Sequence, residues 1–374
     1  MGEDASKLED VVGLCMSGGG FRAALFHVGS LWRLNEIGVL KQVKRISSVS
    51  GGSITAGVLA MNCAALAKGG WSADAFRSGV ADKVRAFCAR DVDAWAIGEG
   101  SVNPWQTAGD VIQREYKRHL FGEATLQDLP VEPVFVINAT NLQTGRVVRL
   151  TRKYLADWMV GEIVNPTIAL ATAVAASSAF PPFLSPIVIE RPGAFKALKG
   201  SIHHNDPEYT ARLYLTDGGA YDNLGLEPVW KRCKTILVSD AGAPFGIGAK
   251  VETDWVKQTL RALDIATDQS RGLRKRWLVD QFERKVREGA YWGVDTEIGD
   301  FPVADRMTCD PAIVGPLASV RTRLNRFTDE EQGRLINWGY ALCDAAIRGR
   351  APKLAPAASR PTKWPYPDQA LGRI

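Results

Sequence analysis

The sequence predicts a three-layer α/β/α fold, in which helices cover a mainly parallel central sheet. The opening of the chain carries most of this prediction. A short apolar run at 11–16 precedes a helical pattern at 21–37, and a second run at 43–49 precedes a second helix at 53–67. Strands that alternate with helices over short connections are typical of parallel sheets. Later apolar runs predict four further strands, at 134–138, 146–150, 212–216 and 235–239.

The composition is that of an ordinary globular protein. The 374 residues suffice for one large α/β domain with insertions or for two modest domains, and 46% of them are apolar. The 46 basic and 41 acidic side chains give a net charge of +5. This mild excess permits an anionic partner, such as a membrane surface, and does not require nucleic acid. None of the six cysteines forms a CxxC pair, so we expect buried, reduced thiols.

Four parts are predicted along the chain. Residues 1–10 form an acidic N-terminal extension without the apolar segment of a signal peptide. Residues 11–245 form the main domain, and 246–350 a mainly helical part packed on it, with a long helical region at 253–290. Residues 351–374 are rich in proline and predict an extended or disordered tail. We expect no membrane-spanning helix, because no run of about 18 apolar residues occurs.

A serine lies between a predicted strand and a predicted helix, in Ser48-Val49-Ser50-Gly51-Gly52. Small residues stand two positions away on each side of Ser50. This is the pattern of a nucleophile elbow, where strand and helix pack closely around a strained turn. Ser48 replaces the first glycine of G-x-S-x-G. The helix that follows favours negative charge near Ser50. The alternative is a Ser-Gly turn that only connects the two elements.

Three consecutive glycines follow the first predicted strand, in Ser17-Gly18-Gly19-Gly20-Phe21-Arg22-Ala23. Unshielded backbone N–H groups can converge on an anion, so this segment predicts a phosphate site or an oxyanion hole. It lacks the Gly-Lys-Ser/Thr of a P-loop but fits the G-x-G-x-x-A pattern of dinucleotide sites. Such sites need an acidic residue at the end of the second strand, where this chain has Ser50-Gly51. That position favours acyl chemistry over a nucleotide-binding oxidoreductase.

An aspartate ends the strand predicted at 212–216, in Asp217-Gly218-Gly219. A simple Asp-Gly turn is the alternative interpretation. A nucleophilic serine needs a group that accepts its proton, and histidine is the usual one. No histidine follows Asp217, so a triad in the order Ser, Asp, His cannot be built around it. A carboxylate that acts directly on Ser50 is what remains.

Four segments make the chain resemble the patatin-like phospholipase family. Ala23 and Ser48 each stand where glycine is commoner in the family, and both are small. The four segments occur in the family's order and span residues 11–245, about two thirds of the chain: the glycine-rich segment 17–23, the serine segment 48–52, ATAVAASSAFPPFLSP at 171–186, and the aspartate segment 217–223.

This resemblance implies a patatin-like fold and a serine acyl hydrolase of the phospholipase A or lysophospholipase type. Ser50 would be the nucleophile and Asp217 its base, without a metal or another cofactor. An acyl-enzyme would form and then release free fatty acid. The remaining residues implied are an oxyanion hole at Gly18, Gly19, Gly20, Phe21 and Arg22, an elbow at Ser48, Gly51 and Gly52, and support from Gly218 and Gly219.

Several alternatives stay open at this point. Acyltransferases and thioesterases share the acyl-enzyme, and a binding module could keep the fold without turnover. Some bacterial members of the family are signal-activated, membrane-degrading effectors of antiviral defence. A regulatory surface for a small-molecule activator could therefore lie in the C-terminal third, and an oligomer is compatible with the sequence.

We expect a cytoplasmic protein in transient, peripheral contact with the inner face of a phospholipid membrane. The segment 271–287 is basic around Trp277, Leu278 and Phe282. It predicts either an amphipathic helix that lies on anionic lipid or a solvated helix packed on the core.

Overall fold

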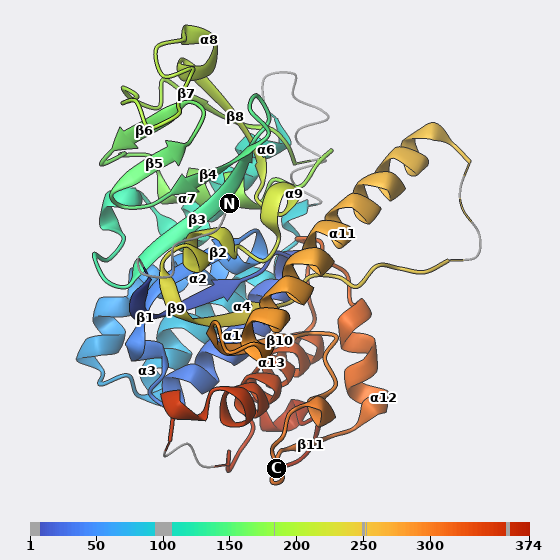
Figure 1. Cartoon of the computed structure of the whole chain (residues 1–374). Helices are drawn as coiled ribbons and strands as arrows, with labels where there is room; N and C mark the ends of the chain where they lie inside the picture. The colour runs from blue at the N-terminus through green and yellow to red at the C-terminus, as the bar shows by residue number, and fades with distance from the viewer. Residues whose placement is uncertain (1–7, 94–106, 183, 249–250, 252, 357–359) are drawn as a thin grey trace.

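The computed structural model describes residues 8–93, 107–182, 184–248, 251, 253–356 and 360–374. At its centre lies a ten-stranded sheet in the order β10-β9-β1-β2-β3-β4-β5-β6, and β8 pairs with both β3 and β7 (Figure 1). The strands are β1 (Glu9–Met16), β2 (Val43–Val49), β3 (Val134–Asn141), β4 (Arg146–Leu150), β5 (Tyr154–Asp157), β6 (Gly161–Val164), β7 (Ile187–Glu190), β8 (Arg212–Asp217), β9 (Cys233–Asp240) and β10 (Glu288–Gly293).

The five strands from β10 to β3 run parallel, and antiparallel strands extend the sheet beyond β3. Helices cover both faces, so the predicted three-layer α/β/α architecture is confirmed. The main helices are α1 (Gly20–Glu36), α2 (Gly51–Lys68), α4 (Asp82–Cys88), α6 (Ala108–Tyr116), α7 (Leu170–Ser178), α11 (Trp255–Glu283) and α13 (Asp329–Arg350); shorter ones are α3 (Ala73–Phe76), α8 (Pro207–Thr210), α9 (Gly219–Asp222), α10 (Glu227–Trp230) and α12 (Pro311–Val314).

The two faces of the sheet carry separate cores, as β1 shows. Its residues Leu14 and Met16 join a large cluster with α1, α2, α7 and α13. The residue between them, Cys15, joins a smaller cluster with Val229 of α10 and Leu278 of α11. Successive side chains of a strand point to opposite faces, so this alternation places the two helical layers on opposite sides.

The C-terminal segment is packed, and the tail prediction was wrong for residues 360–374. Trp364 and Tyr366 are buried, and Leu371 is completely so. The side chain of Asn337 in α13 donates to the carbonyl of Tyr366 at 2.8 Å. A short strand, β12 (Gly372–Arg373), pairs with β11 (Thr308–Cys309). Aromatic side chains between the prolines supply the apolar area that orders this segment.

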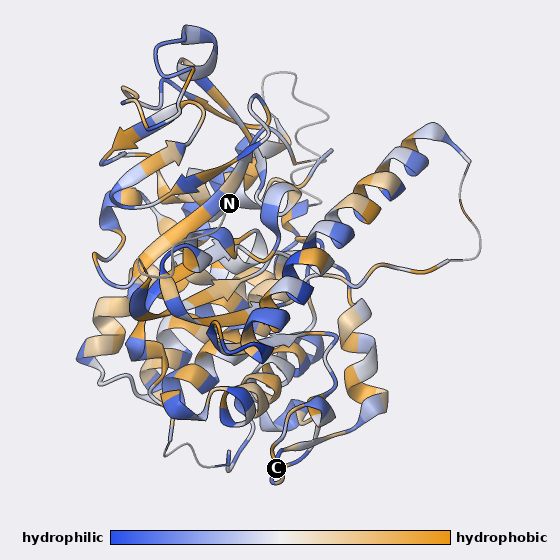
Figure 2. Ribbon diagram, viewed as in Figure 1, coloured by the Kyte–Doolittle hydropathy of each residue, from blue (hydrophilic) through white to orange (hydrophobic). Residues whose placement is uncertain are grey.

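The long helical region predicted at 253–290 also needs correction. α11 ends at Glu283, Lys285 adopts a positive φ of 57°, and the chain then forms β10 at the edge of the parallel sheet. Only Arg271 and Leu278 of this 29-residue helix are buried. Its N-terminal part extends away from the rest of the molecule (Figure 1), and apolar residues interrupt its polar surface there (Figure 2). We call residues 242–248, 251 and 253–270 the arm. No helix in the described part of the chain is long and apolar enough to cross a bilayer.

Candidate active site

The register of β3 brings Ser50 and Asp217 together. The first half of β3 pairs in parallel with β2, and Asn138 stands opposite Val49, the last residue of β2. The second half pairs antiparallel with β8, and Ala139 stands opposite Asp217. β2 and β8 therefore approach the same point of β3 from opposite directions. Ser50 and Asp217 lie where the two strands meet end to end.

Ser50 occupies a strained turn between β2 and α2. Its φ of 52° and ψ of −124° lie outside the regions that non-glycine residues usually adopt. α2 begins at the next residue, so Ser50 stands at the positive end of the helix dipole. A Cβ at Gly51 would lie 1.9 Å from the carbonyl oxygen of Gly20. Only glycine fits there, which explains the small residue directly after the serine.

Asp217 is buried beside the hydroxyl of Ser50. Its carboxylate accepts a hydrogen bond from the amide of Gly219 at 2.7 Å. Burial raises its pKa to about 6, while hydrogen bonds from Gly219 and from the Ser50 side chain act to lower this pKa. Desolvation dominates because the charged form loses more hydration than these two donors return. A carboxylate with this pKa is a better proton acceptor than an ordinary aspartate.

Ser177, at the end of α7, holds the two segments in place. Its carbonyl oxygen accepts from the amide of Ser50 at 3.1 Å and from the amide of Gly218 at 3.2 Å. Its hydroxyl accepts from the amide of Ser50 at 3.0 Å and donates to the carbonyl of Asn138 at 2.6 Å. Ser48 joins this group through the hydroxyl of Ser53 at 2.9 Å. The segment 171–186 was recognised in the sequence, but the role of Ser177 in it was not.

Two glycine amides of the glycine-rich segment are candidate oxyanion donors. The amide of Gly18 donates to the carbonyl of Asn223 at 3.1 Å, and the amide of Phe21 donates to the carbonyl of Arg323 at 3.3 Å. The amides of Gly19 and Gly20 have no acceptor among the described residues. Gly20, whose φ is 58°, lies against Gly51 and therefore beside Ser50.

The side chain of Arg22 is directed to backbone carbonyls of the protein itself. Its side chain is buried, and its guanidinium donates to the carbonyls of Ala241 at 2.6 Å, Ala318 at 2.8 Å and Val320 at 2.9 Å. These bonds fasten the start of α1 to the segment after β9, through Ala241, and to the segment after α12, through Ala318 and Val320. The guanidinium is therefore engaged by the protein's own carbonyls, whereas the backbone amide of Arg22 has no acceptor among the described residues, and its place in the oxyanion hole stays a prediction.

His27 is a structural residue of α1. It is completely buried, and its ring contacts the carbonyl of Ser17 at 2.9 Å and the hydroxyl of Ser239 at 2.8 Å. Burial lowers its pKa to about 4. It supports the end of β1 from below and has no contact with Ser50 in the described structure. Within the described ranges, no group of three or more His, Cys, Asp or Glu is placed to hold a metal ion.

The basic segment 271–287 is largely docked on the body. Arg271 is buried and lies 3.7 Å from Asp240, while Arg274 lies 3.4 Å from Asp222. The ring of Trp277 contacts that of Trp230. Three residues of the segment therefore contact protein groups, as in the interpretation of a helix packed on the core. Arg276 and Arg284 are exposed, and contact of this segment with lipid stays a prediction.

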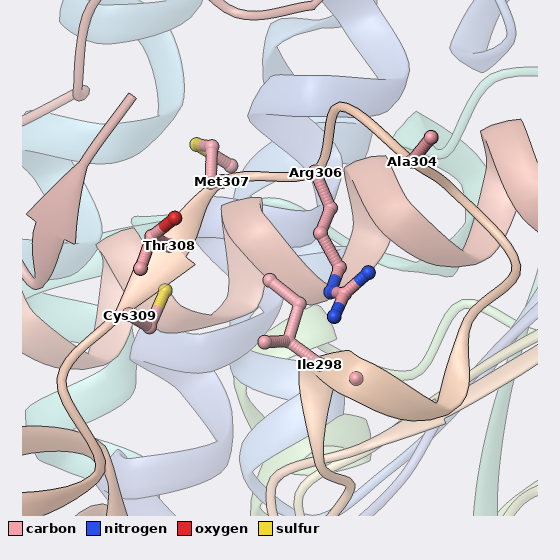
Figure 3. Close-up of a pocket in the computed structure, with 7 residues that line it drawn as sticks. Ile298, Ala304, Arg306, Met307, Thr308 and Cys309 are labelled. Carbon is pink, nitrogen blue, oxygen red and sulfur yellow. The ribbon is translucent and has the colours of Figure 1, made fainter.

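A pocket of about 300 Å³ lies apart from these residues, near β11 in the C-terminal part. Figure 3 shows the side chain of Arg306 directed toward Ile298 on its opposite wall. The Arg306 guanidinium donates to the carbonyl of Val303 at 3.1 Å. None of the residues that line this pocket belongs to the Ser50 site.

Fold and site together define a three-layer α/β/α protein with a serine elbow, a buried carboxylate and free glycine amides at one edge of its sheet. The model of the patatin-like phospholipase family matches residues 14–230, more than half of the chain. The protein belongs to this family. Membership supports lipid acyl hydrolysis in general and favours it over the dinucleotide alternative.

A human phospholipase of known structure shares the fold of this chain. Human GIVD cytosolic phospholipase A2 with methyl gamma-linolenyl fluorophosphonate has a TM-score of 0.51 and 17% identity. The match covers 89% of this chain and 57% of the human chain. The same human protein with this inhibitor and terbium chloride has a TM-score of 0.51 and 16% identity, and the match covers 89% of this chain and 57% of the human chain. VipD from Legionella pneumophila gives a TM-score of 0.35 at 14% identity, over 89% of this chain and 66% of its own. The chain thus spans little more than half the length of the human protein. No curated protein sequence matches it.

Proposed function

We propose that the protein hydrolyses acyl ester bonds in phospholipids or lysophospholipids, with Ser50 as nucleophile and Asp217 as general base. One observation carries the proposal: the ends of β2 and β8 meet at Asn138 and Ala139 of β3, so Ser50 lies beside the buried carboxylate of Asp217, whose pKa burial raises to about 6. A hydroxyl is a weak nucleophile until a neighbouring base accepts its proton.

The reaction follows from these positions. The Ser50 oxygen bonds to the ester carbonyl carbon as its proton passes to Asp217, and the carbonyl oxygen becomes an oxyanion. The amides of Gly19 and Gly20 donate to this oxyanion, and each such donor contributes about 3 kcal/mol to the barrier reduction. Collapse breaks the ester bond, and Asp217 returns the proton to the leaving alcohol. Water, deprotonated by Asp217, then attacks the acyl carbon; the bond to the Ser50 oxygen breaks, Asp217 returns the proton to this oxygen, and the fatty acid is released.

The human structure supports the choice of probe. It holds methyl gamma-linolenyl fluorophosphonate, an inhibitor with a fatty chain. In our proposal such a compound reacts with this chain at Ser50: the serine oxygen bonds to phosphorus, fluoride leaves, and the proton passes to Asp217.

Release of fatty acid from phosphatidylcholine and lysophosphatidylcholine tests the proposal. We expect Ser50→Ala and Asp217→Asn each to lose at least a thousandfold in rate, while Ser50→Ala unfolds at a temperature close to that of the wild type and Asp217→Asn at one no lower. If hydrolysis persists in both variants, Ser50 and Asp217 are not the catalytic pair. Added alcohol and acyl thioester substrates separate hydrolysis from acyl transfer and thioesterase activity, because these reactions differ only in what forms or resolves the acyl-enzyme.

The arm supplies a surface for peripheral membrane contact. Ile247 is 96% exposed and Trp255 78% exposed, and Val251 and Val256 near them are exposed as well. The arm starts directly after Asp240 and Ala241, and Ala241 accepts hydrogen bonds from Arg22 at the glycine segment. Tryptophan and aliphatic side chains beside a site that acts on lipid suit the interface of a bilayer. We therefore propose that the arm, rather than the segment 271–287, contacts the membrane.

A further inference from the structure

A second pocket, of about 350 Å³, opens on the sheet face that carries α10. Its floor comes from β2, β4 and β5, through Arg45, Arg149 and Tyr154. Its walls come from α10, the connection between α10 and β9, and the start of β1, through Pro228, Lys231, Arg232 and Glu9. Four of its seven lining residues are basic and one is acidic. The volume falls within the range of small-molecule sites.

Two of these basic residues have no partner in the part of the chain that the structure describes. Neither Arg45 nor Arg149 forms a hydrogen bond or an ion pair with any residue that the structure describes. Both side chains are half-buried. The Nε atom of Arg149 is shielded from solvent and has no acceptor in the described structure. The pocket therefore holds two guanidinium groups whose donors are unused.

The other basic residues at the rim are already neutralised. Lys231 forms an ion pair with Glu227, and Arg232 lies 3.8 Å from Glu9. The charge that nothing offsets in the described structure thus comes from Arg45 and Arg149. Two like charges in a concave, partly desolvated site repel each other and lose hydration, which is unfavourable unless an anion neutralises them.

The pocket near β11 provides a contrast. It is of similar size, but it holds a single arginine, Arg306, whose guanidinium donates to a backbone carbonyl (Figure 3). Because this guanidinium already has an acceptor, that pocket does not call for an anion. Volume alone therefore does not distinguish the two pockets, whereas unpaired arginines do.

We propose that the pocket lined by Arg45 and Arg149 binds a phosphate group. The planar guanidinium presents paired N–H donors that match two phosphate oxygens, and two such groups suit a dianion better than a single carboxylate. The hydroxyl of Tyr154 adds a further donor to the lining. The phosphate belongs either to a soluble molecule or to a lipid headgroup. The inference does not depend on the proposed hydrolysis, because Arg45 lies five residues before Ser50 on β2, roughly 16 Å along the strand.

Titration calorimetry of the full chain with inorganic pyrophosphate tests the soluble source. Sedimentation with phosphatidylcholine vesicles, with and without phosphatidic acid, tests the lipid source. We expect Arg149→Gln and Arg45→Gln each to weaken the binding at least tenfold. Arg118→Gln removes an exposed arginine in the turn after α6 and is the matched control, which should bind as the wild type does.

The outcomes separate clearly. Loss of pyrophosphate binding in both pocket variants, with binding kept in the control, supports a soluble phosphate ligand. If the pocket variants lose binding only to vesicles that contain phosphatidic acid, the phosphate belongs to a lipid headgroup. A wild type that binds neither probe, or pocket variants that bind as tightly as the control, overturns the proposal. Without ligand, we also expect Arg149→Gln to unfold at a temperature no lower than the wild type, since it removes repulsion. If this variant does not fold, Arg45→Gln and Arg149→Lys carry the same test.

Discussion

The amide of Ser50 donates a hydrogen bond to the carbonyl oxygen of Ser177, 127 residues further along the chain, at 3.1 Å. The same carbonyl accepts from Gly218, directly after Asp217. One oxygen at the end of α7 thereby fixes the backbone on both sides of the candidate dyad. The strained conformation of Ser50 persists because these contacts over-determine it.

Removal of the Ser177 hydroxyl should slow the chemistry more than it destabilises the fold. Ser177→Ala loses one bond to the Ser50 amide and leaves the Asn138 carbonyl without its 2.6 Å donor, at a cost of about 1–2 kcal/mol. We expect the rate of fluorophosphonate labelling to fall about tenfold or more. Ser178→Ala is the control: its hydroxyl contacts Tyr116 and Val174 instead. Equal labelling rates in the two variants would show that Ser177 does not position Ser50.

The pH dependence of acylation should report the Asp217 carboxyl. Its pKa is raised to about 6 by burial, and only the deprotonated form can accept the serine proton. We therefore expect the labelling rate to rise as the pH increases through about 6 and to become constant above it. Rapid-mixing measurements between pH 4.5 and 8 would check this. A rate that is constant across this range, or that falls as the pH rises, is incompatible with a carboxylate base of this pKa.

The raised pKa of Asp217 also predicts that this buried carboxylate lowers the stability of the folded protein at neutral pH. The folded state binds the Asp217 proton more tightly than the unfolded chain, where the pKa is near 3.8. The stability associated with this proton is present below about pH 4 and is lost as the pH rises through 6, a difference of roughly 3 kcal/mol. Asp217→Asn should therefore raise the free energy of unfolding at pH 8 and change it little at pH 4.

Chemical denaturation at pH 4 and pH 8 measures these changes in the free energy of unfolding. Asp128→Asn is a control for which the opposite change is expected. Hydrogen bonds from Thr125 lower the pKa of Asp128, so its loss should destabilise the protein at pH 8. If Asp217→Asn destabilises the protein to the same extent at both pH values, burial of the carboxylate does not govern its pKa.

Vesicle binding should depend on the tip of the arm. Ile247→Ser and Trp255→Ser remove apolar side chains that are 96% and 78% exposed, and each should weaken binding to phospholipid vesicles on the order of tenfold. Hydrolysis of a short-chain soluble ester should not change. Ile202→Ser replaces a residue that is 67% exposed near α8, far from the arm in Figure 1, and should have no effect. If the three variants sediment with the vesicles to the same extent, the arm does not contribute to membrane binding.

The sequence predicted the parts of the fold that depend on local pattern. The first two strands and helices follow from apolar periodicity, and Ser50 and Asp217 stand out because each ends a strand beside glycines. The register that joins them does not follow from any local pattern, because it depends on β3 changing its partner from β2 to β8 after Asn138. The same limit hid Ser177, which looks like one small residue among many in α7.

Errors in the predicted site have a common cause. Gly18 and Phe21 stand in the motif beside Gly19 and Gly20, but the carbonyls of Asn223 and Arg323 accept from their amides, and the carbonyl of Ala241 accepts from the guanidinium of Arg22. Likewise, the basic residues of 271–287 gave no local sign that Asp222 and Asp240 would pair with Arg274 and Arg271. Motif spacing identifies which backbone groups come close, and the tertiary contacts decide which of them stay free.

The most direct test of the Ser50–Asp217 pair is to map the covalent adduct of methyl gamma-linolenyl fluorophosphonate by peptide mass spectrometry. The wild type should carry one phosphonyl group on the peptide that contains Ser50. Asp217→Asn should be labelled at least a hundredfold more slowly, and Ser50→Ala not at all. An adduct on a different residue, or labelling of Asp217→Asn at the wild-type rate, would contradict the account.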